Sequence, residues 1–192
     1  MHKLYLFILL ILASQAEAQS VSALAVADSL YAVGNYSAAI AEYDNLDAKN
    51  ASVYLKLARA HQAKGTLDDA LSFYAQAATG TDEVIAMNEY GKLLITKRKF
   101  KEADSVFTEL LNAYTTNPDF YYQRGRAKEM MPHNIKIDAT DSTITSEKRL
   151  VPHITDYKQA VALDSTHQKA LGELAVFYLK RKEYAMVEKL AF

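Results

Sequence analysis

The stretch ASVYLKLARAHQAKGTLDDALSFYAQAA, residues 51–78, decides the fold because its pattern recurs with variations along most of the chain. Apolar and aromatic residues lie three or four positions apart in both halves, which predicts two amphipathic helices. Gly65 predicts the end of the first helix, because glycine accepts the left-handed backbone that a helix C-cap commonly needs. The two stripes are Tyr54, Leu57, Ala58 and His61, then Leu67, Ala70, Tyr74 and Ala77. A lone hairpin of this size cannot bury both faces, so we expect it to stack on copies of itself.

The same hairpin recurs with a period of about 34 residues. Its first helix carries a small residue at Ala27, Ala58, Gly91, Gly125 and Ala175, and its second helix carries a ring at Tyr43, Tyr74, Phe107 and Tyr157. This pattern resembles the tetratricopeptide repeat family, and the resemblance covers nearly all of the chain after its amino terminus. It implies an all-α fold, a right-handed solenoid of about five helical hairpins.

We predict repeats at 20–50, 51–83, 84–117, 118–167 and 168–192, the last of them incomplete. Pro118 is predicted to open a helix, at a position where a missing N–H costs nothing. In the fourth repeat the second helix is predicted to begin near Pro152, which leaves an insertion near 130–148. Alternating apolar and polar residues there would suit a small hairpin, and a loop without regular structure is the alternative. In repeat proteins such insertions lie on one face and often contact the partner.

Residues 1–18 have the layout of a secretory signal peptide. A basic start precedes an apolar run from Leu4 to Ala13, and small residues follow before Gln19. The run is shorter than the roughly 20 residues of a spanning helix, so cleavage is favoured over a membrane anchor. We therefore predict an exported chain, residues 19–192, with no membrane span after cleavage. A bacterial periplasm or cell exterior is favoured over a eukaryotic secretory route.

The composition narrows the classes of partner. The 192 residues carry a formal net charge of −1 and include no cysteine. The absence of a basic excess argues against a nucleic-acid partner. Without cysteine the chain has no disulfide, so its stability must come from packing.

No motif for catalysis is present. The sequence has no G-x-S-x-G elbow and no phosphate-binding glycine loop, so we predict no enzyme and no cofactor. His133 and His153 flank the insertion, with Asp138 and Asp141 between them, and would be the ligands of a metal site. Their spacing matches no compact ligand motif, so we expect solvated loop histidines and no metal. His61 is predicted to be a hydrogen-bonded core histidine.

The residue after each small position suggests a binding face. Three successive repeats place a cation there, at Arg59, Lys92 and Arg126. The resemblance implies that the first helices line a concave groove, and that these cations form a basic stripe in it. Four residues earlier stand Leu55, Asn88 and Tyr122, which would read a bound segment. The partner would then be a protein or peptide of acidic character, and a solvated face without a ligand is the alternative.

The end of the chain suggests a second role. Apolar residues of the last helix, Tyr184, Val187, Leu190 and Phe192, are followed by no capping helix. Solenoids normally finish with a polar cap. We therefore predict an exported scaffold that binds another protein in its groove. The alternative is a structural or assembly subunit, in which the last helix docks in a homo-oligomer or a cell-envelope complex, and a frayed terminus would need no partner.

Overall fold

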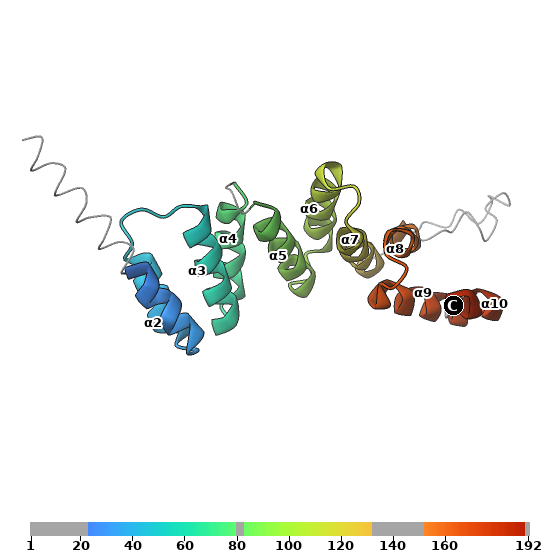
Figure 1. Cartoon of the computed structure of the whole chain (residues 1–192), viewed down its shortest axis with the longest axis horizontal. Helices are drawn as coiled ribbons and strands as arrows, with labels where there is room; N and C mark the ends of the chain where they lie inside the picture. The colour runs from blue at the N-terminus through green and yellow to red at the C-terminus, as the bar shows by residue number, and fades with distance from the viewer. Residues whose placement is uncertain (1–22, 80–82, 132–151, 191–192) are drawn as a thin grey trace, which may run out of the picture. The chain divides into compact units, whose positions relative to one another are not determined.

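The computed structural model describes residues 23–79, 83–131 and 152–190, and all regular secondary structure in these ranges is helical. The predicted signal peptide and nearly all of the predicted insertion lie outside the described residues. By the grouping of its contacts the chain divides into two compact units, Met1–Ala86 and Met87–Phe192. Each unit is built from helices that pair with their neighbours in sequence (Figure 1).

The first unit contains a helix over residues 23–32 and then α2 (Tyr36–Asp44), α3 (Ala51–Lys64) and α4 (Leu67–Ala77). The α3 and α4 helices make the hairpin that the sequence predicts. Gly65 ends α3 with φ +91°, and its N–H and that of Thr66 donate back to Gln62 O and His61 O over 3.1 and 3.0 Å. This is a Schellman-type end, which confirms the predicted left-handed glycine. The buried stripe includes Leu57, Ala58, Ala70, Tyr74 and Ala77.

The second unit contains most of α5 (Glu83–Thr96), which begins before the division between the units. It continues through α6 (Phe100–Ala113), α7 (Pro118–Met130), α8 (Pro152–Leu163), α9 (Gln168–Lys180) and α10 (Tyr184–Leu190). Pro118 begins α7 and Pro152 begins α8, so both predicted helix starts are confirmed. Asn117 caps α7, because its side-chain oxygen accepts from the Asp119 N–H at 3.0 Å.

Two glycines explain the small position of the repeat. A Cβ added to Gly91 would lie 2.7 Å from the ring of Phe107, and one on Gly125 would lie 2.6 Å from the ring of Tyr157. Real Cβ atoms do not approach other atoms so closely, so at both sites the aromatic ring of the second helix requires glycine on the first. In the second unit the spacing of small and aromatic residues is therefore a consequence of hairpin packing.

Candidate protein-binding face

The three predicted cations lie on first helices, in two different units. Arg59 is half-buried on α3 in the first unit. Lys92 is exposed on α5, and Arg126 is half-buried on α7, both in the second unit. The second unit alone therefore carries two of the three cations, Lys92 and Arg126, and they define the candidate face in that unit.

Arg126 is held back along its own helix. Its Nη1 donates to Gln123 Oε1 at 3.4 Å, and its guanidinium carbon lies 6.0 Å from the ring centroid of Tyr122. A cation over an aromatic face at this distance is attracted by the ring quadrupole. The arginine is thus positioned by residues three and four places before it.

Tyr122 has a different role from the predicted one. It is only 7% exposed, and its ring packs 5.8 Å from the ring of Tyr157 and 5.3 Å from that of His167. Burial raises the pKa of the Tyr122 hydroxyl above its ordinary value. The ring belongs to the core between helices α7, α8 and α9. It contacts the guanidinium of Arg126 and offers a partner little surface. Leu55, at the equivalent position of α3, is 4% exposed and is also core.

Asn88 on α5 is half-buried. Its Oδ1 is buried and has no hydrogen-bond partner in the described part of the chain. The predicted contact uses the other end of the amide, because Nδ2 is the donor that a peptide carbonyl would accept from. That contact stays a prediction.

Two carboxylates near Arg126 escaped the sequence analysis. Glu129 on α7 is exposed, and the Tyr157 hydroxyl donates to its Oε2 at 2.7 Å. Glu173 on α9 is half-buried. Burial first and the charge of Glu129 second raise the pKa of Glu173, and the charges of Arg126 and Lys180 offset this only in part. The face therefore has mixed charge here, where the sequence analysis noted only a cation.

A signal in the sequence could have revealed Glu129, which lies four residues after the small Gly125. At the same offset the second and third hairpins have Gln62 and Ile95, and the first and last have Tyr31 and Leu179. Tyr74 donates to Gln62 Oε1 at 2.7 Å, as Tyr157 does to Glu129. Ile95 is 4% exposed and belongs to the one of these hairpins whose ring, Phe107, has no hydroxyl. In the second, third and fourth hairpins the first-helix residue is polar where the second-helix ring needs an acceptor and apolar where it does not. In the first hairpin Tyr43 donates to Asp28 instead, which lies one residue after the small Ala27.

A buried group of charges joins α7 to α8. Asp156 on α8 has a side chain only 4% exposed, and Arg124 binds it through two N–H groups at 3.0 and 2.6 Å. Lys128 donates to the same carboxylate at 2.9 Å and lies 3.9 Å from Asp104 of α6. Burial lowers the pKa of Arg124, but the hydrogen bond and charge of Asp156 outweigh it and the net shift is upward. These cations are engaged inside the hairpin, so they are structural.

The histidines gave one correction and one confirmation. His153 is 8% exposed on α8, with its ring 5.8 Å from that of Tyr157, so the prediction of a solvated loop histidine was wrong for it. The reason is that Pro152 begins a helix, which places residue 153 in the hairpin. His61 contacts Thr66 Oγ1 at 2.8 Å and stacks on Phe73, as a core histidine would. Within the described ranges no three His, Asp or Glu side chains converge as metal ligands. His133 lies outside those ranges.

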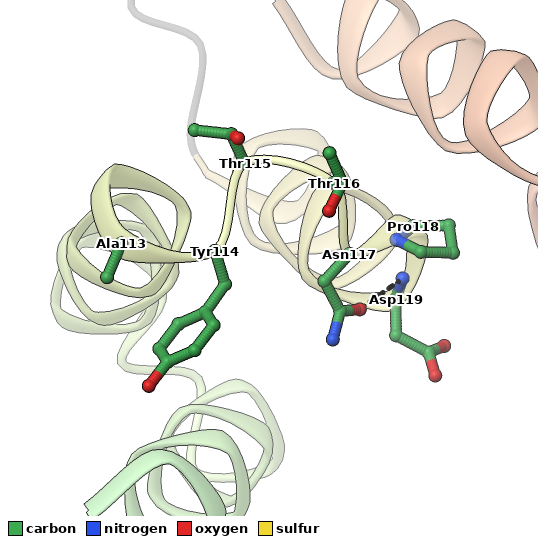
Figure 2. A pocket seen from close by; sticks show the side chains of 7 residues that line it. All are labelled: Ala113, Tyr114, Thr115, Thr116, Asn117, Pro118 and Asp119. Atoms are coloured by element: carbon green, nitrogen blue, oxygen red, sulfur yellow. Dashed lines mark hydrogen bonds between the residues drawn. The ribbon is translucent and has the colours of Figure 1, made fainter.

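The loop between α6 and α7 surrounds a hollow of about 460 Å³ (Figure 2). Asn117 uses its side-chain oxygen there to cap α7, and Tyr114, 45% exposed, meets Phe120 edge to face. Asp119 lies 3.2 Å from His167 Nε2. The side chains of Asn117 and Asp119 are engaged in helix capping and local pairing, so these polar groups are structural. It is lined by Ala113, Tyr114, Thr115, Thr116, Asn117, Pro118 and Asp119.

Several solved structures of the protein MamA have a similar fold. A MamA structure from Desulfovibrio magneticus RS-1, covering residue 41 to the end, matches with a TM-score of 0.69 and 14% identity over 89% of this chain and 90% of that one. A double mutant of MamA RS-1 gives a TM-score of 0.70 and 14% identity, with 89% of each chain covered. Another crystal structure of MamA gives 0.67 and 16%, over 86% of this chain and 90% of that one.

At this identity the likeness shows the fold alone. It confirms the predicted fold class, an all-α solenoid of TPR-like helical hairpins. No family model and no curated protein matches the sequence. Among the described helices, none is long and apolar enough to cross a membrane.

Proposed function

We propose that this chain is an exported scaffold that binds another protein through the first-helix faces of its hairpins. Support comes from the arrangement of the helices. The small residue of each first helix is buried or half-buried against the hairpin, while Lys92 and Arg126, one position later, keep contact with solvent. Within each unit, a packed helical surface of this kind suits capture of an extended or helical segment.

The chemistry of the described residues favours display over catalysis. The clustered ionisable groups of the second unit are joined in structural pairs, such as Arg124 with Asp156 and Tyr157 with Glu129. Lys92 is exposed and Arg126 and Asn88 are half-buried, and with the exposed Glu129 they make up the proposed face in this unit. The mixed charge of this face would give specificity and a fast encounter more than raw affinity.

The test is co-purification from the native host with a charge-reversed chain. Arg59, Lys92 and Arg126 are changed together to Glu, and we expect the partner recovered with the wild type to be lost or reduced about tenfold, because rim charges govern encounter and salt dependence. In a matched control, three exposed lysines that lie at other positions of the repeat are changed to Glu. They are Lys64, Lys101 and Lys169. Equal recovery by the two triple variants would reject the first-helix face as the binding surface.

Export has its own test. The amino terminus of the chain recovered from the native host should begin at Gln19, because cleavage follows the small residues that precede it. A chain that keeps residues 1–18 would contradict the exported part of the proposal and leave the binding part intact.

Assembly is a second candidate function, favoured by one observation. In the α10 helix Met186, Val187 and Leu190 pack against the core of α7, α8 and α9, so Val187 and Leu190 are not left without a neighbour as the sequence analysis expected. No residue of α10 is fully buried, however, and Tyr184 at its start is 64% exposed. A second copy or an envelope protein packed there would cover this surface. Sedimentation at micromolar concentration should then show a species larger than the monomer, and a Tyr184→Glu variant should return it to monomer.

A further inference from the structure

The α9 helix carries an apolar stripe that no described residue covers. Val176 and Leu179 are 45% and 48% exposed, and they lie three residues apart, on one face of the helix. Gly172, four residues before Val176, is exposed and has no heavy atom within 4 Å of where a Cβ would lie. The stripe of Gly172, Val176 and Leu179 thus begins in an open backbone site that another side chain can enter.

In the register of the repeats, this stripe belongs to the proposed binding face. Val176 follows the small Ala175, as Arg126 follows Gly125, and Leu179 takes the position of Glu129. The stripe faces away from the core stripe of the same helix, which is made by Ala170, Leu174 and Tyr178. Val176 and Gly172 therefore occupy positions that were expected to contact a partner, and Leu179 extends the stripe by one turn.

Two carboxylates border the stripe. Glu173 lies one turn before Val176 on α9, and its charge acts on the hydroxyls of both Tyr122 and Tyr157 together with that of Glu129. In the described part of the chain Glu173 makes no hydrogen bond or ion pair. Arg126 is directed to Gln123 and the face of Tyr122, while Glu129 accepts only from the neutral hydroxyl of Tyr157. Neither carboxylate has an ion-pair partner there.

We infer that this part of the face binds a segment of a partner protein that carries an apolar side chain next to a Lys or Arg. The apolar side chain packs on Val176 and Leu179 beside the open backbone of Gly172. The basic side chain reaches Glu173 and Glu129, which supply the charge that complements it. This inference rests on the proposed function. It changes the charge expected of the partner segment at α9 from acidic to basic, whereas the sequence alone pointed to an acidic partner.

The test uses a random twelve-residue peptide library selected on the immobilised full-length chain. We expect enrichment of peptides with Leu, Ile, Val or Phe beside Lys or Arg. Synthetic peptides from that set should bind, in fluorescence anisotropy, about tenfold more weakly to Glu173→Lys and to Val176→Asp, since 1.4 kcal/mol corresponds to tenfold. Glu173→Gln should weaken binding less and remove part of its salt dependence. The matched control, Glu188→Lys on exposed α10, should change the affinity less than twofold.

Other outcomes overturn the inference in distinguishable ways. Enrichment of acidic peptides whose binding is lost in Lys92→Glu would contradict it and support the proposed function. Absence of any enrichment would contradict it and leave the proposed function to the co-purification test. If the chain associates with itself and Val176→Asp abolishes this association, the stripe binds a second copy of the chain and not a basic segment.

Discussion

The two units treat an ionic contact between helices differently. In the first unit Lys56 binds Asp28 at 2.7 Å, and their side chains are 31% and 42% exposed. In the second unit Asp156 is 4% exposed between Arg124 and Lys128. An exposed pair is worth little because water screens it, whereas a buried carboxylate depends on its partners. Similar ion pairs therefore contribute little to the stability of the first unit and much to that of the second.

The connections between helices suggest why. The α3 and α4 helices are joined by Gly65 and Thr66 alone, whereas the connection from α7 to α8 runs from Met131 to residue 151. A longer connection costs more closure entropy than a tight turn. The bidentate contact of Arg124 with Asp156 fixes the register of α7 on α8 without help from a tight turn. The comparison teaches that a long insertion is tolerated where a specific contact closes the hairpin.

The largest expected effect is from Asp156→Ala, which leaves Arg124 and Lys128 without their shared carboxylate. We expect the free energy of unfolding of the second unit to fall by about 3 kcal/mol. Asp28→Ala in the first unit should cost only about 1 kcal/mol, mostly from the hydrogen bond that Tyr43 donates to it at 2.6 Å. Urea titration, with hydrogen exchange to report each unit separately, measures both. Equal losses would break the comparison.

A smaller effect is expected where the first helix meets the second-helix ring. Gly125→Ala would press a Cβ against Tyr157 and lie 3.2 Å from His153 O, so we expect a loss of about 2 kcal/mol in unfolding free energy. The control is Gly172→Ala, where the space is open and alanine should stabilise the helix by up to about 1 kcal/mol. The first unit has Ala27 and Ala58 at this position. If Gly125→Ala were stabilising, the hairpin of α7 and α8 would have room for a Cβ at this position, and the prediction would be wrong.

The third prediction concerns the hydroxyl that Phe107 lacks. Phe107→Tyr would place a hydroxyl near buried Ile95, and an unsatisfied buried hydroxyl costs about 1 kcal/mol or more. Adding Ile95→Gln should recover most of the loss, because Gln62 accepts from Tyr74 in the first unit. Thermal unfolding of the single and double variants measures the coupling. A double variant less stable than the sum of its parts would contradict the shared rule of the two units.

The smallest effect is in the pH dependence, where Asp28 of the first unit and Glu173 of the second contribute with opposite signs. Burial raises the pKa of Asp28, but hydrogen bonds from Lys56 and Tyr43 outweigh it and hold that pKa below its ordinary value. A lowered carboxyl pKa contributes stability at neutral pH that is lost as the pH falls below about 4. The raised pKa of Glu173 does the reverse, since its charge weakens the folded state at neutral pH and acid relieves this.

Two variants that remove one carboxyl charge each separate the contributions of Asp28 and Glu173 to stability. At pH 7 we expect Asp28→Asn to destabilise the protein and Glu173→Gln to stabilise it, the latter by a few tenths of a kcal/mol because the site is partly solvated. The Glu173→Gln difference should shrink towards zero as the pH falls to 3, whereas the Asp28→Asn difference should persist to lower pH, because the lowered pKa keeps that carboxyl charged for longer. Denaturant midpoints across that pH range provide the measurement. The same sign for both variants at pH 7 would contradict the assignment.

The sequence determined the hairpins, because helix periodicity, Gly65 and Pro118 act through neighbouring residues. It also placed Arg126 and Lys92 on first helices at positions that keep contact with solvent. It misassigned Tyr122, because residues on one face of a helix look alike until the next hairpin covers some of them. Asp156 and Glu173 were missed for the same reason, since their partners lie on other helices.

Only the tertiary structure decided which charges are free to meet a partner. Arg124 and Arg126 are two residues apart and chemically the same, yet one is bound by the buried Asp156 and the other rests on Tyr122 near solvent. Burial and partner geometry depend on contacts between helices that are distant in sequence, and local pattern carries no record of them. The sequence alone thus specified the repeat and its exposed first-helix positions, and packing between helices determined which of the charges are left to meet a partner.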